Sequence, residues 1–388
     1  MIDRRYLVDT LFDLIRVPTE VPMGTTTLMA PDDPKLVHYV QTVVRPKLTE
    51  IGAYDVQEAP LNQLIVRYGA GTSERSLLVM AYTPTQHSNL MTDPFRPRIA
   101  SAPAAGFDEP CVYGQGVSQN KVHMAVALSV LKWLIDHQVH LRGRLLFAVN
   151  NEGRSSHACS DAILSAIDRP PEQALILIGT DMNISVGNRG RVDVYVHVNG
   201  TATHSSEPEQ GLSAIEGARL VMDRVARMEL PGAHPLLGGR HIVPYQVLYA
   251  PLAPHTLPGY AKITFDRRLL PGDDIDDAVD QVRRAIGDLA PFEVTVERGV
   301  HMLPALVDPS APVVRALCAA NNTVRGVDPT LYYGRGSFDA GGPCAHGVPT
   351  VMWGASGGNG LLGDDFVPLA SAWAEADVLA KLVVDVLG

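Results

Sequence analysis

The stretch Val122-His-Met-Ala-Val-Ala-Leu-Ser-Val-Leu-Lys-Trp-Leu134, followed by Arg144-Leu-Leu-Phe-Ala-Val149, decides the fold class. The first part is apolar and long enough to predict a buried helix, and the second is a short apolar run that predicts a buried strand. Leu77–Ala81 and Ala174–Gly179 are further runs of the strand type, each bounded by turn residues. Strands that alternate with helices predict an α/β fold with a mostly parallel sheet flanked by helices, whose ligand site lies at the carboxyl ends of the strands. Residues 82–120 are polar, Pro-rich and aperiodic, so we expect them to contribute to a site rather than to regular structure.

The periodicity changes after about residue 190. Val192–Val198 alternates apolar and polar residues, which is typical of a half-exposed strand. Helical patterns over Ser213–Met228 and Ile275–Leu289 lie among further short strands, so the order of elements is βαββαβ. We therefore expect a small ferredoxin-like domain inserted into the α/β body. The predicted segments are residues 1–190 for the first part of the body, 191–300 for the inserted domain and 301–388 for the C-terminal part of the body.

Composition excludes several classes of protein. The chain has 388 residues, of which 46% are hydrophobic and 19% charged, and its net charge is −10. An acidic chain without a Lys/Arg-rich run is a poor partner for nucleic acid or an anionic membrane surface, and no apolar run reaches the ~18 residues of a spanning helix. Its beginning lacks the apolar core of a signal peptide. The four cysteines are scattered without a CxxC pair, which predicts neither disulfides nor a structural zinc site. We expect a cytoplasmic protein.

Four motifs follow one another along the chain. They are Tyr113-Gly-Gln-Gly-Val-Ser118 with Lys121, Gly200-Thr-Ala-Thr-His-Ser-Ser-Glu-Pro208, Leu257-Pro258 followed by Phe265-Asp-Arg-Arg268 and Pro271-Gly272, and Gly347-Val-Pro349 followed by Gly354. Together they resemble the co-catalytic zinc metallopeptidase and deacylase family, which includes acetylornithine deacetylase, succinyl-diaminopimelate desuccinylase, carboxypeptidase G, aminoacylase and allantoate amidohydrolase. The resemblance covers essentially the whole chain.

The resemblance implies a fold, an assembly and a chemistry. It implies a zinc exopeptidase-like body with an inserted lid domain that forms a homodimer, and we expect Val192–Val198 to be the exposed edge strand of that dimer. Two zinc ions bridged by a carboxylate and a water cleave an amide or peptide bond, and a neighbouring Glu takes a proton from the water. The lid-domain histidine, here His204, reaches into the partner subunit's site and donates to the developing oxyanion.

Most of the family's zinc ligands are replaced in this chain. The first His position holds Tyr82, the bridging Asp position holds Gln119, and the last His position holds Leu361. The position of the general base holds Asn151, while the adjacent ligand Glu152 is retained; the remaining ligand falls at Thr180 or Asp181. Since the retained carboxylates serve different metals in the family, the substitutions predict that the protein works without zinc or any other cofactor.

The candidate site is polar rather than apolar. A set of amide, phenol and carboxylate side chains at the predicted strand ends favours a hydrogen-bonding pocket for a small polar molecule, and the alternative is a polar network satisfied within the protein. As catalytic residues we expect Glu152, His204, Asp181 and His87. As substrate-binding residues we expect Tyr82, Gln119, Asn150, Asn151, His255, Arg335 and Ser337.

Three functions fit the sequence. The first is a metal-independent enzyme that acts on a small polar C–N substrate, such as an amide or imide, by acid–base catalysis. The second is a non-catalytic protein that binds such a molecule. The third is an ordinary zinc hydrolase with shifted ligands, drawn from His87, His123, His157 and Glu152.

Overall fold

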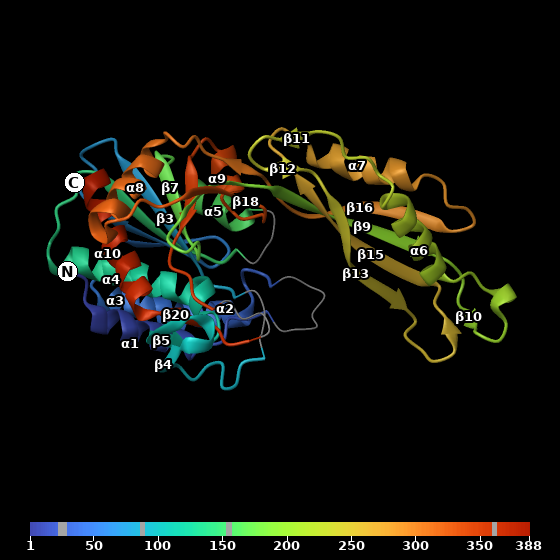
Figure 1. The fold of residues 1–388 in the computed structure, drawn as a ribbon, viewed down its shortest axis with the longest axis horizontal. Coiled ribbons are helices and arrows are strands. Elements are labelled where there is room, and N and C mark those ends of the chain that lie inside the picture. Colours follow the sequence, from blue (N-terminus) through green and yellow to red (C-terminus); the bar gives the residue numbers. More distant parts are fainter. Residues whose placement is uncertain (22–28, 86–89, 153–156, 359–362) are drawn as a thin grey trace. The chain divides into compact units, whose positions relative to one another are not determined.

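The computed structural model describes residues 1–21, 29–85, 90–152, 157–358 and 363–388. The chain divides into two compact units. The body consists of Met1–Gly187, Ala305–Tyr333 and Asp339–Gly388, and the inserted domain consists of Asn188–Pro304 with the short segment Gly334–Phe338. Figure 1 labels helices and strands of each unit.

The body is built on a large mixed sheet. Its centre is four parallel strands in the order β6 (Arg144–Asn150), β3 (Ser76–Tyr82), β7 (Gln173–Leu177) and β19 (Thr350–Trp353). Antiparallel pairings extend the sheet on both sides. The outer strands are β1 (Val56–Ala59), β2 (Gln63–Tyr68), β8 (Ile184–Asn188), β17 (Ala305–Leu306) and β18 (Leu331–Gly334). The predicted mostly parallel sheet flanked by helices is confirmed.

Apolar helices cover this sheet (Figure 1). Every residue of α4 (Val122–Asp136) from Val122 to Leu131 is buried, as the long apolar run predicts. The helices α1 (Arg4–Ile15) and α10 (Leu369–Leu387) pack against α4, and their leucines and valines join one core with those of β3 and β6. The other body helices are α2 (Pro34–Tyr39), η1 (Val40–Val44), α3 (Arg45–Glu50), η2 (Pro103–Ala105), η3 (Val117–Lys121), α5 (Ala158–Ser165), α8 (Pro312–Arg325) and α9 (Gly341–Ala345).

The segment 82–120 has more regular structure than its composition indicates. It contains β4 (Arg98–Ala102) and β5 (Phe107–Tyr113), which form a three-stranded antiparallel sheet with β20 (Phe366–Pro368). The expectation of an irregular segment is wrong because the third strand comes from the far end of the chain. A pairing between distant segments leaves no local periodicity to detect.

The inserted domain has the expected βαββαβ order. Its sheet runs β13 (Ile242–Ala250), β15 (Tyr260–Leu269), β9 (Gly190–Asn199) and β16 (Glu293–Met302), all antiparallel. The helices α6 (Ala214–Val225) and α7 (Ile275–Ile286) pack on one face against the alternate valines of β9. Shorter elements are β10 (Thr203–His204), η4 (Pro208–Gln210), β11 (Ala233–His234), β12 (Gly238–Gly239) and β14 (Thr256–Leu257).

One expectation about this domain is wrong. The strand that contains Val192–Val198 is not an edge, because β9 lies between β15 and β16. Its alternation arises because one face packs on the two helices while the other carries polar residues such as Asp193. The edge strands of this sheet are β13 and β16.

Candidate functional site

Two of the expected substrate-binding residues end neighbouring strands of the body sheet. Tyr82 is the last residue of β3 and Asn150 the last residue of β6, and the two are register partners in the parallel pair. Asn151 and Glu152 follow Asn150 directly and are buried. The fold therefore brings Tyr82, Asn150, Asn151 and Glu152 to the carboxyl edge of the sheet, where ligand sites of α/β proteins lie.

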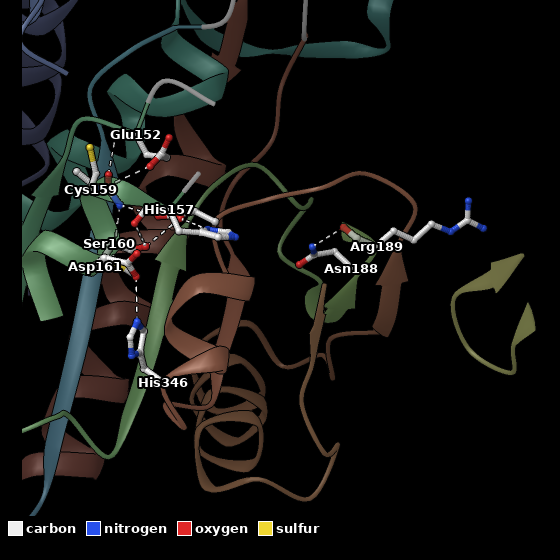
Figure 2. Close-up of polar contacts among 11 residues, drawn as sticks. Glu152, His157, Cys159, Ser160, Asp161, Asn188, Arg189 and His346 are labelled. Carbon is white, nitrogen blue, oxygen red and sulfur yellow. Dashed lines mark hydrogen bonds and ion pairs between the residues drawn. The ribbon is translucent and has the colours of Figure 1, made fainter. Parts of the chain in front are cut away.

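A buried carboxylate that the sequence analysis did not single out organises this edge. Asp339 is only 1% exposed, and three side chains donate hydrogen bonds to it. Its Oδ1 accepts from His157 Nδ1 at 2.7 Å and from Ser160 Oγ at 3.0 Å, and its Oδ2 accepts from Asn150 Nδ2 at 3.0 Å. Figure 2 shows His157 and Ser160 beside the start of α5. The only signal in the sequence was the place of Asp339 in a Gly-rich segment.

Glu152 lies beside this network. Its backbone N–H donates to Asn150 Oδ1 at 2.8 Å, and its Oε2 accepts from the Cys159 N–H at 3.4 Å, a contact drawn in Figure 2. Burial, followed by the negative charges of Asp339 and Glu152, raises the pKa of Tyr82 well above its ordinary value. The Tyr82 hydroxyl therefore remains a hydrogen-bond donor at every physiological pH.

Asn151 lies at the position of the family's general base. Its hydrogen-bonding groups are paired with other groups of the protein. Its Nδ2 donates to Asn62 O at 2.5 Å, its Oδ1 accepts from the Thr83 hydroxyl, and its N–H donates to Gln63 Oε1 at 2.9 Å. The side chain joins the 61–63 turn to the end of β3. These contacts favour an internal polar network at this position over contact with a ligand.

The other candidates in the body lie on η3, after β7, or outside the described residues. Gln119 is partly exposed on η3. Asp181 is exposed, has a positive φ of 55°, and its N–H donates to Ser356 Oγ at 2.7 Å. His87 and Leu361 fall outside the described residues.

The remaining candidates belong to the inserted domain. β10 pairs with β14, which places the rings of His204 and His255 6.3 Å apart. His204 is exposed and its Nδ1 lies 2.7 Å from Ser206 Oγ. Arg335 and Ser337 lie in the segment that clusters with this domain.

A second histidine–carboxylate pair lies deeper in the body. His123 Nδ1 is 2.7 Å from Glu375 Oε1, and neither side chain is exposed. Glu375 Oε2 also accepts from the Ala355 N–H at 3.0 Å. A Cβ on Gly354 would lie 2.6 Å from His123 Cε1, so this pair needs glycine there. His123 is therefore fixed in the core rather than grouped with His157.

The side chains that can ligate a metal ion are dispersed among the described residues. Within the part of the chain that the structure describes, no three His, Cys, Asp or Glu side chains come together in a group that could hold a metal ion. His123 and His157 each pair with a different carboxylate. The described residues therefore fit neither the family's two-zinc centre nor the set of shifted ligands.

Comparisons with known proteins match the inserted domain to a family model and the chain to distant relatives. Residues 186–293 match the family model described as the peptidase dimerisation domain. The chain is 22% identical to a succinyl-diaminopimelate desuccinylase from Helicobacter hepaticus over 260 residues, which cover 63% of this chain and 64% of that relative. The chain is similar to M20 family peptidases and deacylases. The predicted resemblance is thereby confirmed.

Solved structures agree on the fold of this M20 relative. A tripeptidase from Staphylococcus aureus matches with a TM-score of 0.75 at 17% identity, covering 100% of this chain and 99% of that one. An M20 family metallo-carboxypeptidase from Sulfolobus solfataricus matches with a TM-score of 0.75 at 13% identity, covering 97% and 98%. Within the described residues of the M20 relative, no helix combines the length and apolarity that a bilayer crossing needs.

The comparisons also correct one expectation. The comparisons contradict the prediction that the protein has no cofactor, because the similar protein from Sulfolobus solfataricus is named an M20 family metallo-carboxypeptidase. The prediction rested on the replacement of family zinc ligands at positions such as Tyr82 and Gln119. Since the described side chains do not fit two zinc ions, no catalytic step is assigned to a metal below.

Proposed function

We propose that this M20 relative hydrolyses a C–N bond of the amide or peptide kind in a small substrate that carries a carboxylate. The observation that carries the proposal is the set of acid–base groups at the carboxyl edge of the body sheet. Glu152 and Asp339 supply buried carboxylates, and Tyr82 supplies a hydroxyl that stays protonated. The relationship to desuccinylases and peptidases supports the same class of reaction.

A cluster of arginines in the inserted domain favours binding of a carboxylate by that domain. Nε and Nη1 of Arg268 are buried without a hydrogen-bond partner among the described residues, while Nη2 pairs with Asp266 Oδ2 at 2.8 Å. Burial, followed by the positive charges of Arg335 and Arg268, lowers the pKa of Arg189. Cations that repel one another are stabilised by a bound anion, and the planar guanidinium group suits a carboxylate.

The arginine cluster makes a testable prediction. Arg335→Ala is expected to raise KM about tenfold or more for a substrate with a free carboxylate, since one charge-assisted contact is lost, and to leave KM unchanged for its carboxamide analogue. Arg298→Ala is the matched control, because Arg298 is an exposed arginine of the same domain that pairs with Asp276. Equal KM changes for the two substrates would contradict the role of Arg335.

A homodimer through the inserted domain is part of the proposal. The edge strand β13 exposes Val243, Tyr245, Val247 and Tyr249, which are between 44% and 57% exposed, and an apolar edge of this kind favours pairing with another strand. The other edge, β16, carries charged residues such as Glu293 and Glu297. We expect β13 to lie at the dimer interface.

Light scattering tests this assembly. Val247→Lys is expected to convert a dimer into a monomer at micromolar concentration, because a lysine on an edge strand opposes strand pairing, with little change in the melting temperature. Thr295→Lys on β16 is the control and should remain dimeric. A monomeric wild-type protein would refute the proposed dimer.

The non-catalytic alternative has one observation in its favour. The side chain at the base position, Asn151, is held by Asn62 and Thr83 and is not free to activate a water. Calorimetry and turnover assays on one panel of N-acyl amino acids and dipeptides separate the two functions. Hydrolysis of any member supports the enzyme, whereas binding without turnover supports the binding protein.

A further inference from the structure

We propose that the inserted domain contains a second binding site, for the zwitterion of a small amino acid, in a groove beside Arg267. The groove has a volume of about 680 Å³, within the range of roughly 300–1,000 Å³ that small-ligand sites occupy. All its lining residues belong to the inserted domain, so the site is separate from the polar strand ends of the body. It goes beyond the proposed function and does not depend on it.

Arg267 interrupts the apolar pattern of β15, the strand labelled beside α6 and α7 in Figure 1. The alternate residues of this strand that join the core of the domain are Ala261, Ile263, Phe265 and Leu269. Arg267 occupies the next position of the same series and is 1% exposed. Burying a charge costs several kcal/mol unless a partner compensates it, so an arginine at this core position needs an opposite charge.

The guanidinium group of Arg267 has only neutral acceptors within the domain. Nη1 donates to Arg268 O, and Nη2 donates to Gln281 Oε1 at 3.1 Å. Nε is buried and has no hydrogen-bond partner. Because Gln281 also lines the groove, the charged end of Arg267 borders the groove together with this amide. Among the described residues, no carboxylate forms an ion pair with this guanidinium.

The carboxylates whose charges act on Arg267 are engaged by other arginines. Asp273 binds Arg240 through two hydrogen bonds, and Asp277 pairs with Arg284 at 3.1 Å. Burial therefore dominates over both carboxylates and lowers the pKa of Arg267. A bound carboxylate would supply the missing counter-charge, and its planar geometry suits a guanidinium group.

The outer part of the groove has the opposite charge. Glu229 and Asp274 line the groove and are exposed, and neither forms an ion pair within the part of the chain that the structure describes. In total, four carboxylates and three arginines line the groove. This excess of carboxylates repels a simple anion, whereas a molecule with an ammonium group beside its carboxylate is attracted at both ends.

Apolar residues complete the groove. Met228 and Leu230 from the segment after α6 line it, together with Ala278 and Ala285 of α7. These side chains suit an aliphatic group of the ligand. A buried guanidinium, exposed carboxylates and an apolar wall together fit an α-amino acid with an aliphatic side chain, for which leucine is the probe.

Calorimetric titration of the full-length protein with leucine tests the site. Wild type is expected to bind leucine, and Arg267→Leu should weaken this binding at least about tenfold, because a hydrogen-bonded contact with a charged group is lost. Leucine bound elsewhere in the protein would bind both proteins equally, so the comparison reports on the groove. Equal affinities, or no binding by the wild type at millimolar leucine, would overturn the inference.

The fold and a matched arginine provide the controls. Leucine at position 267 continues the apolar series of β15, so the melting temperature of Arg267→Leu without ligand should not fall, since apolar replacements of buried charges are often neutral or stabilising. Arg283 lies on α7 and pairs with Asp280, but it does not line the groove. Arg283→Leu should bind leucine like the wild type, and an equal loss in both variants would overturn the inference.

Asp274→Asn tests the zwitterion and leaves Arg267 unchanged. Asp274 Oδ1 accepts from Asp277 N at 2.8 Å at the start of α7, and asparagine preserves this cap without the charge. The variant is expected to bind leucine about twofold to fivefold more weakly, the range of an exposed ion pair. In the wild type, 4-methylpentanoate, which lacks the amino group, should bind more weakly than leucine. Unchanged leucine affinity in Asp274→Asn, or tighter binding of 4-methylpentanoate, would overturn the inference.

Discussion

Replacing Glu152 by glutamine is expected to lower turnover of a C–N substrate by about 10²–10⁴-fold while the protein remains folded. Glu152 is the residue of the family's acidic pair that this chain retains, and it lies 5% exposed at the carboxyl edge of the body sheet. Glutamine keeps an oxygen that can accept from the Cys159 N–H, as Glu152 Oε2 does. The substitution thus removes the charge and leaves the local contact.

Glu172→Gln is the matched control for this prediction. Glu172 Oε2 also accepts a backbone N–H, from Ser76 at 3.3 Å, but Ser76 is the first residue of β3, so this contact lies at the opposite end of the strand from Tyr82. Steady-state kinetics and thermal melting are measured on both variants. A Glu152→Gln protein that loses melting temperature but keeps its rate per folded molecule would show a structural role instead.

A buried lysine is expected to make the free energy of unfolding strongly dependent on pH. Lys121 is 1% exposed, and its Nζ donates to Val17 O at 2.9 Å and to Ile15 O at 3.4 Å. Burial lowers the pKa of Lys121 from 10.5 to about 7, although Glu20 and Asp365 partly oppose this. The unfolded chain therefore holds a proton that the folded chain lacks between pH 7 and about 10, so the free energy of unfolding falls as the pH decreases through that range.

Comparison with a methionine variant isolates the contribution of Lys121 to the pH dependence of the free energy of unfolding. Between pH 7 and 9.5 the free energy of unfolding of the wild-type protein should rise by about 3 kcal/mol more than that of Lys121→Met. Lys132→Met, which changes a partly exposed lysine of the following helix α4 that pairs with Asp136, should show the wild-type pH dependence. Denaturant unfolding at both pH values measures the difference, and parallel curves for wild type and Lys121→Met would contradict it.

The contribution of Asp365 to the free energy of unfolding has the opposite dependence on pH. Burial raises the pKa of Asp365 to about 6, even though Ser118 and Gly116 donate hydrogen bonds to it. Its contribution to the free energy of unfolding is complete below about pH 4 and is lost as the pH rises through about 6. In the folded protein most of the Asp365 titration lies below pH 7, so the comparison between pH 7 and 9.5 reports chiefly on Lys121.

Local sequence determined the secondary structure and the class of the fold. The apolar run over Val122–Leu134 became the buried helix α4, and the short runs at Leu77–Ala81 and Arg144–Val149 became neighbouring parallel strands. These outcomes could be predicted because helix and strand periodicity are properties of a few consecutive residues. The same apolar runs also placed Tyr82 and Asn150 at strand ends, with Glu152 two residues beyond, as part of the expected site.

Only the tertiary structure decided which distant residues meet. Val192–Val198 has the alternation of a half-exposed strand, yet β9 lies inside its sheet, because alternation reports on the two faces of a strand and not on its neighbours. His157 and Asp339 are ordinary residues of two separate segments, and their hydrogen bond exists because α5 and α9 pack together. The sequence by itself determined the elements, the family and the polar strand ends, whereas the histidine–aspartate pair depends on contacts across 182 positions that no local pattern specifies.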